Sequence, residues 1–235
     1  MLRSIDSSTL GRGVHGWLDS HFHFSFAEYY NPENINFGAL RVLNDDIVLP
    51  GTGFDTHPHQ NMEIVSYVVA GELTHGDSMG NEQTITRGQA QYMSAGTGVL
   101  HSEYNHGTVP LRFLQIWILP DQDGYRPNYG DHRFVWEERI NTWLPLAAST
   151  DNSASSAPIK IHQDVNLFVS YLTTSTILPL AVAPGRQAYL MLAEGKARVN
   201  GIGLVERDAM EIIEEDIEVQ ALEDAHVIVI ELAKG

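Results

Sequence analysis

The chain contains no cysteine among its 235 residues. Disulfide bonds and thiolate metal ligands are therefore excluded, and a bound transition metal must be held by imidazole and carboxylate groups. The absence also fits a reducing compartment, and the cytoplasm is the location we expect.

Basic residues are scarce. The sequence has 14 lysines and arginines against 30 aspartates and glutamates, which gives a formal net charge of -16 and a pI near 4.9. Nucleic-acid affinity depends mostly on neutralising phosphates with basic side chains, so we expect no nucleic-acid partner. A docked basic protein remains compatible with this acidic composition.

Long apolar runs are also missing. No stretch of 18 consecutive apolar residues occurs, and the first residues, Met1 to Asp6, lack the apolar segment of a signal peptide. We therefore expect a soluble protein without a membrane partner.

Short strand-like segments separated by turn signals run along most of the chain, and this pattern predicts an all-β barrel or sandwich. The low-complexity segment Ala147–Pro158 predicts a linker. We expect an N-terminal domain over residues 1–145, a linker over 146–158 and a C-terminal domain over 159–235. In the N-terminal part, residues 40–49 predict two short strands joined by a turn at Asn44-Asp45-Asp46, and Pro58 predicts a sheet edge, rim or bulge.

Two pairs of metal-binding side chains have strand spacing. His57 and His59 form one pair, and His101 and Glu103 form the other. Because residues i and i+2 of a strand share one face, each pair projects together, and facing strands would bring three imidazoles and one carboxylate to a point. Such a set suits iron, manganese, nickel, copper or zinc.

The spacing leaves alternatives open for the ligand set. Glu63 has the same strand parity as His57 and His59, so spacing alone leaves open whether Glu63 or Glu103 is the fourth ligand. His21 and His23 form another His-x-His pair, interleaved with phenylalanines. We interpret that pair as structural, since no partner pair at matching spacing accompanies it.

The two segments resemble the paired motifs of the cupin superfamily. The first comprises Gly51, His57, His59, Glu63 and Gly71, and the second comprises Gly88, Gly96, His101 and Asn105. Ser94 stands where the general second motif has proline, and four residues rather than two separate Gly96 from His101. Both departures are typical of the pirin family, which the run Ser94–Glu103 resembles, as do the segments 57–59, 67–72 and 75–81. The likeness is close over roughly residues 15 to 120.

This resemblance implies a bicupin: two β-barrel (double-stranded β-helix) domains, of which only the N-terminal one binds metal. It also implies that His57, His59, His101 and Glu103 are the metal ligands, with Glu103 in the role that spacing left open. We expect one divalent transition metal, iron(II) first, with nickel, copper, cobalt, manganese or zinc as alternatives.

Some pirins open the central ring of quercetin with dioxygen and release carbon monoxide. The resemblance therefore implies a metal-dependent quercetin 2,3-dioxygenase with a flavonol or related aromatic substrate and O2, in which Glu103 is also the catalytic base. The alternative is a non-enzymatic, metal- or redox-responsive regulatory protein, as eukaryotic pirins are thought to be. A different cupin chemistry, such as an isomerase, is a third hypothesis.

Overall fold

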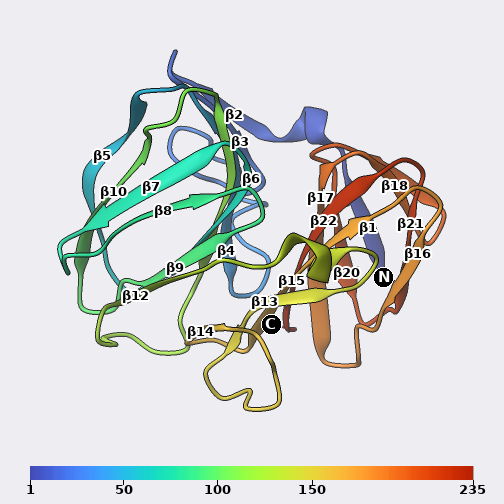
Figure 1. Cartoon of the computed structure of the whole chain (residues 1–235). Coiled ribbons are helices and arrows are strands. Elements are labelled where there is room, and N and C mark those ends of the chain that lie inside the picture. The colour runs from blue at the N-terminus through green and yellow to red at the C-terminus, as the bar shows by residue number, and fades with distance from the viewer. Residues whose placement is uncertain (235) are drawn as a thin grey trace. The chain divides into compact units, whose positions relative to one another are not determined.

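The computed structural model describes residues 1–234, and these divide into two compact units. One unit comprises residues 10–134 and 161–163, and the other comprises residues 1–9, 135–160 and 164–234. Each unit is built from one seven-stranded and one four-stranded sheet (Figure 1). The predicted all-β organisation with two barrels is confirmed. No helix in the described part of the chain has the length and apolar character needed to cross a membrane.

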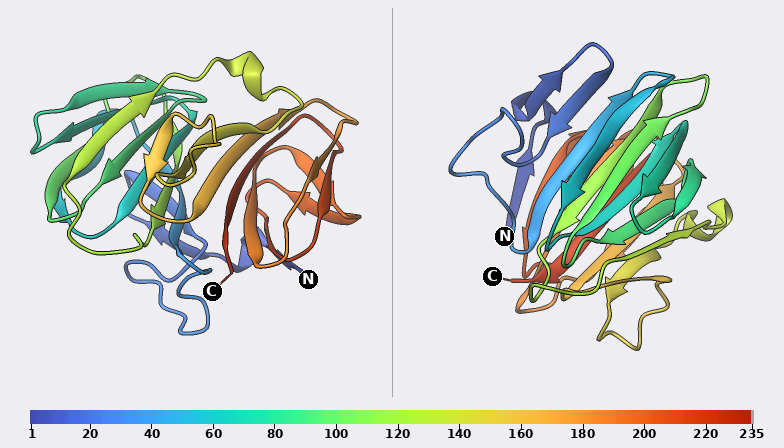
Figure 2. Two further views of the ribbon diagram at one scale, coloured as in Figure 1. Left: turned by 90° about the horizontal axis from the view of Figure 1, so that it is seen from below. Right: turned by 90° about the vertical axis from the view of Figure 1, so that its left-hand side faces the viewer.

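The unit of residues 10–134 carries the histidine pairs. Its larger sheet has the order β12 (Asn128–His132), β9 (Ala90–Ser94), β6 (Glu63–Ala70), β11 (Leu111–Ile118), β4 (Leu40–Val48), β3 (Leu18–Phe22) and β2 (Gly11–Val14). Its smaller sheet has the order β5 (Thr52–His59), β10 (Val99–Asn105), β7 (Glu72–Asp77) and β8 (Glu82–Thr86). The strands β4 and β11, far apart in the chain, run side by side (Figure 2).

An apolar core joins the two sheets of this unit. Val48 and Val68 of the larger sheet pack with Leu73 and Ile85 of the smaller one, and all four are buried. Burial of apolar side chains from both sheets stabilises the barrel and holds β5, β7 and β10 opposite the larger sheet.

The other unit has a second pair of sheets. The larger has the order β1 (Leu2–Ile5), β20 (Ala209–Ile213), β17 (Arg186–Glu194), β22 (Ala225–Ala233), β15 (Val165–Leu172), β13 (Leu144–Ser149) and β14 (Ile159–Ile161). The smaller has the order β16 (Ile177–Leu180), β21 (Ile217–Ala221), β18 (Lys196–Val199) and β19 (Ile202–Val205). The first strand, β1, drawn in blue, lies among the orange and red C-terminal strands, since it pairs with β20 (Figure 1).

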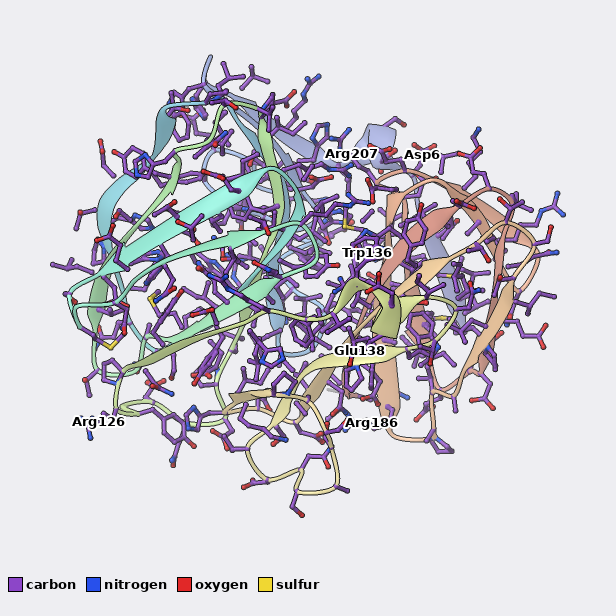
Figure 3. The ribbon with its side chains drawn as sticks, viewed as in Figure 1. Asp6, Arg126, Trp136, Glu138, Arg186 and Arg207 are labelled. Atoms are coloured by element: carbon purple, nitrogen blue, oxygen red, sulfur yellow. The ribbon has the colours of Figure 1, made fainter. Side chains whose placement is uncertain are left out.

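Two short 3-10 helices complete the chain, η1 (Ser7–Thr9) and η2 (Trp136–Arg139). Trp136 and Glu138, labelled in Figure 3, lie on η2. The fully buried guanidinium carbon of Arg139 lies 4.7 Å from the centre of the Trp136 ring.

The predicted turn at Asn44-Asp45-Asp46 is wrong, because residues 40–48 form one continuous strand, β4. All three polar residues are buried. Asp45 accepts two hydrogen bonds from the Arg112 guanidinium on β11, at 2.9 and 2.7 Å, and Asp46 accepts one from the Ser20 hydroxyl. Turn-forming composition was outweighed here by side-chain partners on the neighbouring strands.

The linker predicted over residues 146–158 begins inside strand β13, which extends to Ser149. Ala147 and Ala148 are buried and pair with β15, since small side chains fit a tightly packed strand as well as a loop. Residues 150–158 do form a loop with turns. The domain boundaries at 145 and 158 stay a prediction, because compact units do not by themselves define folding domains.

Candidate metal centre

Strand β10 lies between β5 and β7 and brings the candidate ligands together. His101 stands directly opposite His57 on β5, and Glu103 stands opposite His75 on β7. Along β10, His101, Glu103 and Asn105 alternate inward and are buried, as the two-residue strand period predicts. Strand β5 is an edge strand, so the prediction for Pro58 is confirmed.

Three imidazoles converge. One nitrogen from each of His57, His59 and His101 lies within 4.8 Å of the others. The Nε2 atoms of His57 and His101 are 3.1 Å apart. Two ligands about 2.1 Å from one cation and at right angles to each other are separated by about 3 Å, so this spacing fits neighbouring positions of an octahedral ion.

Glu103 belongs to a second group. Its carboxylate lies within 4.8 Å of nitrogens of His75 and His101, and the two groups share only His101 among the described residues. The carboxylate is 2% exposed. It accepts hydrogen bonds from Ser66 Oγ at 2.9 Å, Gln91 Nε2 at 2.8 Å and Gln115 Nε2 at 2.6 Å. Three donors fix its orientation.

The hydrogen bonds around the imidazoles leave nitrogen lone pairs facing the cluster. His57 Nδ1 donates to the Asp55 carbonyl oxygen at 2.7 Å, so its Nε2 atom is the free acceptor. Burial, with a smaller contribution from the neighbouring imidazoles, lowers the pKa of His59 to about 4 and that of His101 to about 3. Neutral imidazoles with free lone pairs are the form that ligates a cation, so the donor set fits a divalent metal ion.

His75 is a residue of this cluster that the sequence analysis did not assign. It is fully buried, its Nε2 atom donates to Asp77 Oδ2 at 2.9 Å, and its Nδ1 atom lies 3.4 Å from His101 Nδ1. Burial raises the pKa of Asp77, but hydrogen bonds from His75 and Asn81 outweigh it and lower that pKa overall. The segment His75-Gly76-Asp77 is visible in the sequence, but the distance of His75 from His101 depends on the pairing of β7 with β10.

Glu63, the other carboxylate that spacing allowed, lies outside both groups. It is buried and accepts a hydrogen bond from Ser94 Oγ at 2.6 Å and from the His162 backbone N–H at 3.2 Å. His21 and His23 also lie outside both groups. Burial lowers the pKa of His23 to about 4, which agrees with a neutral structural histidine.

A cavity of about 290 Å³ adjoins the cluster. His57, His59 and Glu103 line it on one side, together with Gln115. Its apolar walls are mostly aromatic, and they include Trp17, Phe22, Phe26, Phe54 and Trp117. The dimensions and the mixture of aromatic walls with a few polar groups are typical of a small-molecule site.

Comparisons with known proteins identify the family of the chain. Residues 5–118 match the pirin family, and residues 146–232 match the quercetinase C-terminal cupin domain. A protein of Escherichia coli K12 named quercetin 2,3-dioxygenase is 40% identical over 224 residues, which cover 94% of each chain. A pirin-like protein of Caulobacter vibrioides is 41% identical over 225 residues, which cover 95% of this chain and 96% of the relative.

Solved structures are similar to the whole chain. The crystal structure of YhhW from Escherichia coli has a TM-score of 0.93 and 36% identity, and the match covers 100% of this chain and 99% of that one. The structure of the bacterial pirin YhhW in complex with nickel(II) has a TM-score of 0.92 at 36% identity, with both chains fully covered. From its relatives and its fold, the chain belongs to the pirin family.

Proposed function

We propose that this protein is a metal-dependent dioxygenase that cleaves flavonols such as quercetin, with His57, His59, His101 and Glu103 as the metal ligands. The carrying observation is that His57, His59 and His101 converge, that His101 also belongs to the group containing Glu103, and that His57, His59 and Glu103 line a cavity with aromatic walls. The relatives named quercetin 2,3-dioxygenase and the nickel(II) complex of a related pirin support the proposal. Iron(II) is the first metal to test, and nickel is the second.

The reaction consumes one flavonol and one dioxygen and yields carbon monoxide and a phenolic ester. The ring carbon that bears the 3-hydroxyl leaves as carbon monoxide, and each of its two former neighbours gains one oxygen atom. When bound, the divalent cation supplies Lewis-acid polarisation of the hydroxyl oxygen and electron exchange with dioxygen.

The residues of the chain carry the remaining steps. Glu103 accepts the proton of the 3-hydroxyl, since it is the only carboxylate among the four proposed ligands and its oxygens are held by Ser66, Gln91 and Gln115. The edge-to-face pair of Trp17 and Phe54, with ring centres 5.1 Å apart, forms part of the wall against which a planar substrate packs. The aromatic walls also exclude water from the reacting atoms.

The test is turnover of quercetin in air, followed by the loss of flavonol absorbance and by the release of carbon monoxide. Protein loaded with iron(II), nickel, cobalt, manganese or copper is compared with the same concentration of free metal. We expect turnover that falls at least about 100-fold in Glu103→Gln, because removing a general base costs this much or more. Glu63→Gln, which changes a buried carboxylate outside the cluster, is the matched control and should retain activity. Turnover no faster than free metal with every ion would exclude the dioxygenase and favour the regulatory alternative.

A further inference from the structure

A row of polar side chains crosses the inner face of the larger sheet in the unit of residues 10–134. Four polar residues stand directly opposite one another on neighbouring strands: Asn44 on β4, Gln115 on β11, Ser66 on β6 and Gln91 on β9. Residues directly opposite each other on neighbouring strands share one face, so the four side chains point to the same side of the sheet. The row begins beside Phe22 of β3, which lines the cavity.

Three members of this row are engaged with Glu103. Gln115, Ser66 and Gln91 each donate a hydrogen bond to its carboxylate. Asn44 differs from them, because its Oδ1 atom is buried and has no hydrogen-bond partner among the described residues. The residue is 2% exposed and lines the cavity.

A buried amide oxygen without a partner is costly, and native proteins rarely retain one without a reason. Asn44 is one of the residues that line the cavity, together with aromatic rings and the proposed metal ligands His57, His59 and Glu103. What it requires is a hydrogen-bond donor carried by a molecule that fits between those rings. A phenolic hydroxyl on a planar aromatic ligand meets both requirements.

We propose that Asn44 is the specificity residue of the cavity and accepts a hydrogen bond from a phenolic hydroxyl other than the one that reacts. The proposal rests on the proposed function for its substrate class, the polyphenolic flavonols. Asp46, two residues along the same face of β4, also lines the cavity and is held by the Ser20 hydroxyl, so this end of the cavity is polar. The protein should therefore prefer flavonols with additional hydroxyl groups over the parent 3-hydroxyflavone.

The experiment compares two substitutions of nearly equal shape. Asn44→Val removes the polar group, and Asn44→Thr keeps an oxygen acceptor in a side chain of the same size, with both residues suited to a strand. Equilibrium binding of quercetin and of 3-hydroxyflavone is measured under anaerobic conditions by quenching of tryptophan fluorescence, so no turnover is needed. Metal content and thermal unfolding of each variant show whether the barrel is intact.

We expect Asn44→Val to weaken quercetin binding about five- to tenfold and to change 3-hydroxyflavone binding by less than about twofold, which corresponds to one neutral hydrogen bond. Asn44→Thr should retain part of the preference. An equal loss for both ligands, no loss for either, or no binding of either flavonol to the unsubstituted protein would overturn the assignment. If selective binding is found without turnover, the reaction proposal fails while the binding role of Asn44 stands.

Discussion

At the scale of single residues, the environment of His101 extends beyond the proposed ligands. Asp77 accepts a hydrogen bond from His75, and His75 in turn lies next to the Nδ1 atom of His101. The carboxylate fixes which nitrogen of His75 carries the proton, and His75 then accepts the Nδ1 proton of His101. The Nε2 atom of His101 is thereby kept unprotonated toward the cluster, as is common for hydrogen-bonded metal ligands.

This series of contacts from Asp77 through His75 to His101 predicts that His75→Ala weakens metal binding without removing a proposed ligand. We expect a loss of about 10- to 100-fold in affinity, the usual effect of deleting a residue that orients a ligand. The measurement is a competition titration with a chelator of known affinity. His106→Ala, an exposed histidine on the same segment of chain, is the control and should bind metal normally. Unchanged affinity in His75→Ala would show that His101 does not depend on this contact.

His23 predicts a pH dependence of stability. Burial lowers its pKa from 6.5 to about 4, so between these values the unfolded chain binds a proton that the folded chain resists. Stability should be fully present above pH 6.5 and fall as the pH drops toward 4, by about 3 kcal/mol for a shift of this size. In metal-free protein, His59 changes stability in the same direction.

Urea unfolding of metal-free protein between pH 4 and 7 measures this effect. The His23→Gln variant keeps a neutral polar side chain and should show a smaller slope of unfolding free energy against pH than the unsubstituted protein. Equal slopes would mean that His23 is not held neutral by the fold.

The sequence indicated the four proposed ligands but not the residues that orient them. His57, His59, His101 and Glu103 stand at spacings with a direct meaning in a strand, so their inward direction could be inferred. The choice of Glu103 over Glu63 came from family resemblance, since both carboxylates fitted the parity. His75 and Asn44 could not be assigned, because their roles depend on which strands pair and in which register.

At the scale of elements, a bulge shapes strand β5. His101 pairs with His57 and Glu103 pairs with Phe54, so three steps along β5 match two steps along β10. The extra residue changes the parity of β5 between these points, and it lets both Phe54 and His57 line the cavity. Strict alternation would have placed them on opposite faces, which is why the sequence pattern did not predict Phe54 as part of the wall.

Gly53 allows the two strands to approach at this bulge. A Cβ atom at this position would lie 2.3 Å from the Glu103 carbonyl oxygen and 2.6 Å from the Tyr104 Cα atom. We therefore expect Gly53→Ala to push β5 away from β10, to lower the free energy of unfolding by about 1–3 kcal/mol and to weaken metal binding.

Gly76→Ala is the matched control on the other side of β10. A Cβ atom there would approach nothing closer than 3.5 Å, to the Ser102 hydroxyl, so we expect a change within about 0.5 kcal/mol. Urea unfolding measures the stability of both variants, and competition with a chelator measures their metal affinity. Equal changes in stability and metal affinity in Gly53→Ala and Gly76→Ala would contradict the close approach of β5 and β10.

Strand β4 shows the limit of local sequence signals. Asn-Asp-Asp is typical of turns and predicts one, but Arg112 and Ser20 on the flanking strands provide partners for the two carboxylates. Burial also raises the pKa of Asp46 well above its ordinary value, with Asp45 and Glu103 adding to the effect. A polar run can thus form a central strand when its partners are distant in sequence, and such partners are visible only in the fold.

At the scale of the whole molecule, both groups of potential ligands lie in the unit of residues 10–134. The described core of the other unit is built from aliphatic side chains, and its buried His226 pairs with Glu194 at 3.0 Å. The two relatives match nearly the full length of the chain, and so the similarity spans both units. We therefore expect one metal ion per chain.

Elemental analysis of protein purified without added metal, in parallel with its His101→Ala variant, tests this assignment most directly. His101 is the residue common to both ligand groups, so its loss should abolish binding. We predict about one equivalent of a divalent transition metal per chain, falling to less than about one tenth in His101→Ala, with the affinity loss expected for a missing ligand. Equal metal content in the two proteins, or purified protein that neither contains nor takes up a divalent ion, would contradict the account.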